Sequence, residues 1–217
     1  MRYLVCLLLL LCCKLWVFGQ RTQVNVEKIK ESKNSGYYLK ITIVKNGIKY
    51  IRNSKDYDID MYLDKLGGQL NVADISLITE KIIPYINDYS LASTRVRKYY
   101  ITSTQIDYQG MPKPKSLRYP LAIDAMFAIN RLFYSLYLHR ISTYPVLYDS
   151  KTLAEVNDNP TMVRLMAKRY YQWFDLVKSA KYSRIQILSS EFAQFLNKGT
   201  VKWWDMMIVS KGIRDDI

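Results

Sequence analysis

The chain is poor in the residues on which secreted proteins and enzymes most often depend. Its three cysteines, Cys6, Cys12 and Cys13, all stand in an N-terminal stretch that reads as removable. A chain that lost this stretch would have no cysteine, which excludes disulfides, thiolate nucleophiles and cysteine metal sites together. The single histidine, His139, leaves no histidine pair to bind zinc.

Motifs that assemble a catalytic site are also missing. The eight glycines form neither a phosphate-binding loop nor a Gly-x-Ser-x-Gly elbow. Asp56, Asp58 and Asp60 have the spacing that opens a calcium loop, but Met61 and Gly67 replace the glycine and the glutamate that complete it. We therefore predict a protein that is no enzyme and that uses no cofactor and no metal. A carboxylate-based hydrolase is the alternative, since 19 acidic residues offer many pairs.

An export signal is the clearest pattern that the sequence does contain. Arg2 precedes an apolar run at residues 4–11, and the small residue Gly19 stands just before Gln20. Lys14 interrupts the apolar stretch, which is therefore shorter than the roughly 20 residues that span a bilayer. We expect cleavage near Gly19–Gln20 and a periplasmic or secreted product that is membrane-proximal without spanning the membrane.

Lipidation is the alternative fate of this segment. Cys12 and Cys13 follow a run of leucines, and a lipid on one of them would make an outer-membrane lipoprotein. The residues before them, Leu11 and Cys12, stand where a lipobox prefers a small residue. A cleaved signal over residues 1–19 is therefore the favoured interpretation.

The product that remains is strongly basic. Removing residues 1–19 takes away Arg2 and Lys14 and leaves 30 Lys and Arg against 19 Asp and Glu, a net charge of about +11. Such a charge attracts an acidic protein, a cell-wall polymer or an anionic lipid. Nucleic acid is not expected as a partner of an exported protein. The alternative is that the charge is spread over solvated faces and serves solubility.

The N-terminal part of the product reads as β-structure followed by a helix. Residues 23–29 and 37–53 are rich in β-branched and aromatic residues, and residues 95–108 have a similar composition. Asn46–Gly47 favours the type I′ turn of a hairpin, so a three-stranded antiparallel sheet is expected. Apolar residues then recur every three or four positions over 72–89, which predicts a helix.

Three residues set the expected limits of that helix and of the next. Asn71 is the expected N-cap of the first, and Pro84 should kink or end it near Ile83. Pro120 suits the first turn of a central helix that runs to about Arg140.

The C-terminal half reads as helix-rich, and the fold class is therefore α+β, with several helices packed on the N-terminal sheet. The 198 residues from Gln20 to Ile217 suit a single domain. The further expected elements are a hairpin from residues 144–148 and 153–156, a helix over 160–179 capped by Asn159, and a short helix over 191–197.

A polar stripe on the central helix is the first candidate partner-binding site. Asp124, Arg131, Ser135 and His139 fall within a sector of about 80° on a helical wheel, around the small Ala128. The stripe either lines a pocket or partner site, or is the solvent face of the helix.

Aromatic residues beside cations give the second candidate. Trp203 and Trp204 are adjacent, so we expect one in the core and the other as an interface anchor. Stacking rings beside cations also suit sugars or lipid headgroups, although amphipathic packing is the alternative. The three sets of this kind are residues 95–100, Lys168–Arg169–Tyr170–Tyr171 and Lys202–Trp203–Trp204.

Three segments carry a resemblance to a known group. Residues 122–130 (AIDAMFAIN), 144–149 (YPVLYD) and 170–174 (YYQWF) resemble the C-terminal half of small, mostly uncharacterised exported proteins of Bacteroidetes. Gln20 just after the cleavage site is also similar to signals from that group. Some exported proteins of this kind protect cells from secreted toxins, so the resemblance implies an immunity-like role. It transfers no functional residue.

These patterns together predict an exported, non-enzymatic binding protein. We expect an immunity-type inhibitor of an envelope-targeting toxin, which uses the Asp124–His139 stripe or a face with Trp203 or Trp204. Because this chain is basic, the toxin should be acidic or directed at the envelope. The alternative is a module that binds an anionic envelope polymer or lipid through its basic-aromatic residues.

Overall fold

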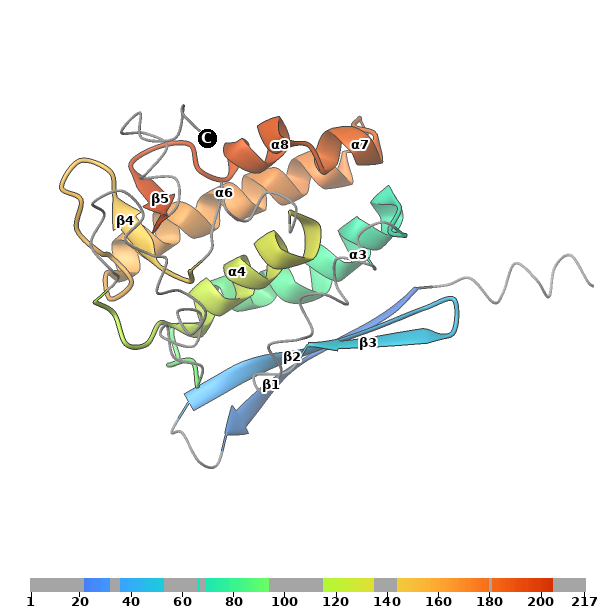
Figure 1. Ribbon diagram of the computed structural model, residues 1–217, viewed down its shortest axis with the longest axis horizontal. Coiled ribbons are helices and arrows are strands. Elements are labelled where there is room, and N and C mark those ends of the chain that lie inside the picture. The colour runs from blue at the N-terminus through green and yellow to red at the C-terminus, as the bar shows by residue number, and fades with distance from the viewer. Residues whose placement is uncertain are drawn as a thin grey trace, which may run out of the picture.

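A three-stranded antiparallel sheet, with helices packed on one of its faces, forms the core of what the structure describes (Figure 1). The structure is a computed structural model, and it describes residues 22–31, 36–52, 66, 69–93, 115–134, 144–179 and 181–204. It confirms the predicted α+β class. The export signal, the aspartates at 56–60 and the predicted strand at 95–108 lie outside the described residues.

The sheet has the order β1-β2-β3 and ends in the predicted hairpin. Asn46 and Gly47 have φ angles of 53° and 76°, so both take the left-handed conformation that a type I′ turn requires. Side chains alternate along β2, and Leu39, Ile41 and Ile43 are buried against the helices. The strands are β1 (Gln23–Glu31), β2 (Gly36–Lys45) and β3 (Ile48–Arg52).

The first helix begins and ends where the sequence predicts. α3 (Val72–Ile82) starts after Asn71, whose side chain accepts from the Asp74 N–H at 2.9 Å, while Asp74 accepts from the Asn71 N–H at 2.8 Å. This reciprocal pair is a capping box. Pro84 lacks a backbone donor, and the chain tightens there into the 3-10 helix η1 (Ile83–Asn87).

The central helix α4 (Leu121–Phe133) begins after Pro120, as expected, and ends at Phe133. The predicted continuation over residues 135–140 lies outside the described residues. Tyr134 has φ −126° and ψ 25°, which takes the backbone out of the helix. Nearly every residue of α4 is buried, because the helix lies between the sheet and α6 (Pro160–Lys178) (Figure 1).

The predicted second hairpin forms as a short one, with β4 (Leu147–Asp149) in its first arm. The Asp149 N–H donates to the Ala154 carbonyl and the Val156 N–H donates to the Leu147 carbonyl, both at 2.9 Å, and Tyr148 forms a bridge with Glu155. Leu153 takes a left-handed φ of 59° at the end of the turn. β4 also pairs with the distant strand β5 (Val201–Trp203), whose Val201 and Trp203 side chains are buried. The remaining helices are α7 (Arg184–Ile187) and α8 (Ser190–Phe195).

A backbone seam joins the start of β2 to the start of α4. The Tyr37 N–H donates to the Leu91 carbonyl at 2.9 Å, and the Ser93 N–H donates to the Tyr37 carbonyl at 2.7 Å. On its other side, the same segment pairs with Tyr119 and Leu121 at 2.8–2.9 Å. Gly36 makes the close approach possible, since a Cβ there would lie 2.8 Å from the Ser93 backbone.

We therefore expect Gly36→Ala to lower the free energy of unfolding by about 1–3 kcal/mol, because the added methyl must displace backbone. Gly47→Asn is the matched control. No atom lies within 4 Å of a Cβ at Gly47, and asparagine tolerates its left-handed φ. Urea titration followed by circular dichroism measures both variants. Equal stability of Gly36→Ala and wild type would contradict a tight seam.

Candidate functional site

Asp124, the first residue of the predicted polar stripe, is buried in an ion pair with β3. Its Oδ1 and Oδ2 accept from the Arg52 guanidinium at 2.9 and 3.1 Å, a bidentate geometry, and the residue is 2% exposed. Arg52 also donates to the Leu39 carbonyl at 3.4 Å. The contact pins α4 to the sheet, so Asp124 stabilises the fold and does not reach the described surface.

The rest of the stripe is only partly described. Arg131 is half-buried, and its guanidinium carbon lies 5.6 Å from the centre of the Phe127 ring. Ser135 and His139 lie outside the described residues. The described residues therefore include only two of the four, Asp124 and Arg131, and a partner site along the stripe stays a prediction.

Both tryptophans of the predicted anchor pair are buried, at 0% and 1% exposure. The Trp203 indole N–H donates to the Tyr170 hydroxyl at 2.9 Å, and that hydroxyl donates to Asn130 Oδ1 at 2.8 Å. Trp204 packs edge-on against Tyr144 with ring centres 5.1 Å apart. These contacts tie β5 and α6 to α4.

A second buried pair repeats this arrangement farther along α6. The Trp173 indole N–H donates to the Tyr134 hydroxyl at 2.7 Å, and Tyr134 donates to the Ile187 carbonyl at 2.8 Å. Burial raises the pKa of both Tyr134 and Tyr170, so both hydroxyls stay protonated at any physiological pH. They serve as hydrogen-bond partners within the core.

The predicted basic-aromatic set on α6 is divided between the interior and the surface. Tyr170 is buried, and Arg169 is half-buried, donating to the Val201 carbonyl at 2.6 Å. Burial lowers the pKa of the Arg169 guanidinium from its usual value. Lys168 and Tyr171 are exposed.

One exposed face of α6 carries most of its charge. Arg164, Lys168, Tyr171, Asp175 and Lys178 are all exposed and recur every three or four residues, so they form one stripe along the helix. Among the described residues, no carboxylate pairs with Arg164 or Lys168 within ion-pair distance. The N-terminal half of this face is positive and open to solvent.

Tyr89 extends this face beyond α6. Tyr89 is 37% exposed, like Tyr171, and the Arg164 guanidinium carbon lies 5.7 Å from the centre of the Tyr89 ring. The Asn87 side-chain amide donates to the Tyr171 hydroxyl at 2.9 Å. Burial and the neighbouring Tyr89 raise the pKa of Tyr171. We call Tyr89, Arg164, Lys168 and Tyr171 the Tyr89–Tyr171 surface.

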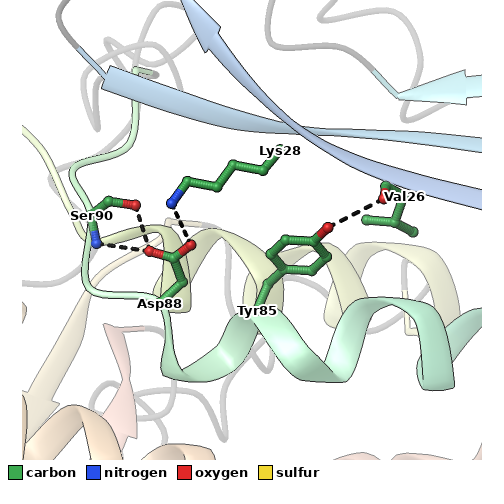
Figure 2. Close-up of polar contacts among 5 residues, drawn as sticks. All are labelled: Val26, Lys28, Tyr85, Asp88 and Ser90. Atoms are coloured by element: carbon green, nitrogen blue, oxygen red, sulfur yellow. Dashed lines mark hydrogen bonds and ion pairs between the residues drawn. The ribbon is translucent and has the colours of Figure 1, made fainter.

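The turn that carries Tyr89 is anchored to β1, as Figure 2 shows. Lys28 Nζ donates to Asp88 Oδ2 at 2.7 Å, and the Ser90 N–H donates to Asp88 Oδ1 at 3.0 Å. The Tyr85 hydroxyl donates to the Val26 carbonyl at 3.3 Å. Burial acts to raise the pKa of Asp88, but the bonds from Lys28 and Ser90 outweigh it and leave this pKa below its usual value.

A pocket with a volume of about 440 Å³ is lined by Tyr148 of β4 and by residues 115–116, 153–155 and 158. Its two acids are Glu155 and Asp158. The Glu155 carboxylate accepts from the N–H groups of Lys115 and Ser116 and from the Tyr148 hydroxyl, the last at 3.2 Å. Glu155 therefore holds residues 115–116 in place, which is a structural role.

Within the described ranges, no three His, Cys, Asp or Glu side chains gather closely enough to hold a metal ion. In the same ranges, no helix is long and apolar enough to cross a membrane. No protein-family model, curated protein or solved structure matches the chain. The resemblance to exported Bacteroidetes proteins therefore stays a prediction.

Sequence reasoning missed two members of the Tyr89–Tyr171 surface. These are Arg164 and Tyr89. Arg164 could have been found, because its spacing from Lys168 and Tyr171 places all three on one helical face. No sequence pattern indicates Tyr89, because its position beside α6 depends on how η1 packs against that helix.

Replacing Arg52 with methionine leaves the Asp124 carboxylate buried without its partner. We expect Arg52→Met to lower the free energy of unfolding by about 3–5 kcal/mol. The double variant Arg52→Met/Asp124→Leu removes both charges and should recover most of that loss. Urea titrations of the three proteins test this, and a double variant weaker than Arg52→Met would contradict the paired burial.

The Lys28–Asp88 contact makes stability depend on pH. A carboxyl whose pKa is depressed by folding stabilises the folded state above its unfolded pKa of about 4, and this contribution is lost as pH falls through the folded value. Lys28→Met should therefore flatten the fall in stability below about pH 4. Unfolding titrations from about pH 2 to about pH 7 would show parallel curves for the two proteins if the contact contributed nothing.

Proposed function

We propose that this chain is an exported binding protein that acts without catalysis, as an immunity-type inhibitor of an envelope-targeting toxin. The observation that carries the proposal is the charge of residues 160–204. They hold eight Lys and Arg against two acids, Asp175 and Glu191, and the exposed N-terminal half of α6 displays part of this excess. A surface of one sign attracts an oppositely charged partner and speeds its association. The toxin is therefore acidic where it meets this chain.

The contacts of three carboxylates, Asp74, Asp124 and Glu155, favour binding over hydrolysis. Asp124 is engaged by Arg52, and Asp74 by Lys45 and Thr22. Glu155, in the pocket, accepts hydrogen bonds from four groups, the Lys115 and Ser116 N–H groups and the Ser116 and Tyr148 hydroxyls. A general acid or a nucleophile needs an oxygen free to reach the substrate. These carboxylates instead support the fold.

An anionic envelope polymer or lipid is the second candidate partner. The same exposed cations favour it, because a basic surface also binds phosphate-rich polymers and headgroups. This candidate predicts binding that tolerates a change of partner and weakens steeply with salt.

The test is retention of a partner by tagged protein from a periplasmic extract of the source cells. We expect one acidic protein at one-to-one stoichiometry, and we expect cells that lack this gene to become sensitive to competitors that secrete that protein. Vesicles of phosphatidylglycerol in phosphatidylcholine are the parallel probe for the second candidate. Absence of both a stoichiometric partner and a change in sensitivity would refute the immunity function.

A further inference from the structure

We infer that the partner docks on the Tyr89–Tyr171 surface and that it is a folded protein with an acidic patch. This inference rests on the proposed function and names the contact surface within it. Four observations carry it: two exposed rings, their fixed positions, two cations that pair with no carboxylate of the described residues, and an acid placed where a linear polyanion would be repelled.

The two tyrosines have the character of interface anchors. Tyr89 and Tyr171 are each 37% exposed in the free protein. A partner that covered them would bury the large apolar ring and the polar hydroxyl of each. Tyrosine and arginine are the side chains that most often dominate the energy of protein interfaces. The surface presents two tyrosines and an arginine together.

These anchors are already positioned in the free protein. Arg164 lies over the Tyr89 ring, and Asn87 holds the Tyr171 hydroxyl at 2.9 Å. Asp88, between Asn87 and Tyr89, is itself tied to Lys28 (Figure 2). A surface that is ordered before binding loses less conformational entropy when its partner arrives.

The cations on this surface are available to an acidic partner. Arg164 and Lys168 lie one turn apart on α6, and neither pairs with a carboxylate among the described residues. A guanidinium accepts a carboxylate in bidentate geometry, and a lysine one turn away can reach a second one. Aspartate and glutamate side chains of a protein therefore fit here.

Asp175 distinguishes a protein from a linear polyanion. It stands on the same exposed face, one turn beyond Tyr171 and just before Lys178. A linear polyanion that follows the helix meets repulsion at Asp175. A folded protein can place a cation opposite Asp175 and acids opposite Arg164 and Lys168. The order of charges along this face therefore favours a partner with the complementary order.

The experiment measures the affinity of the one-to-one partner, purified after retention by wild-type protein, for variants of the full chain. Arg164→Glu/Lys168→Glu should weaken binding by about 100-fold or more, and Tyr171→Ala by about tenfold or more. Tyr171→Phe keeps the ring and should retain most of the affinity. Lys40→Glu/Lys49→Glu makes the same charge change on the face of the sheet that points away from the helices and should leave affinity within about threefold.

Each outcome decides the matter. Loss in the α6 variants with retention in the sheet variant, when circular dichroism shows all variants folded, supports the surface. Equal binding by wild type and the α6 variants overturns the surface and leaves the immunity function standing. Equal weakening by both double variants overturns it as well, since net charge alone then controls binding. Binding of wild type to phosphatidylglycerol vesicles with no protein partner overturns both proposals.

Discussion

The buried ion pair between Arg52 and Asp124 fixes how the helices sit on the sheet. Arg52 ends β3 and Asp124 lies in the first turn of α4, so one bidentate contact joins the two layers. Two desolvated charges are stable there only as a pair, which makes the contact specific for one orientation of α4. α6 then packs on α4 through the Tyr170–Asn130 bond, and the orientation of α6 sets where its charged face points.

No disulfide contributes to the described part of the chain, because the three cysteines stand at the N-terminus. Stability must come from apolar burial together with hydrogen bonding of the polar groups that are buried with it. The two tryptophan–tyrosine bonds on α6 meet that requirement, since each satisfies an indole N–H and a hydroxyl inside the core. Large aromatic side chains thus perform the cross-linking that disulfides perform in many small secreted proteins.

Local signals in the sequence predicted local structure well. Asn46–Gly47 specified the hairpin, Asn71 the start of α3, and Asn159–Pro160 the start of α6, because turns and caps depend on neighbouring residues alone. Long-range choices were not accessible. Nothing near Asp124 indicates that Arg52, 72 positions earlier, removes it from the surface. The pairing of β4 with β5 and the place of Tyr89 beside α6 depend in the same way on tertiary packing.

We propose that an acidic protein partner covers the exposed face of α6 and the turn after η1. Amide hydrogen exchange of the wild-type chain, measured with and without its one-to-one partner, locates this contact. We expect added protection over residues 85–93 and 160–175, with exchange in β1 and β3 unchanged. Added protection confined to the sheet, with residues 85–93 and 160–175 exchanging as in the free protein, would contradict it.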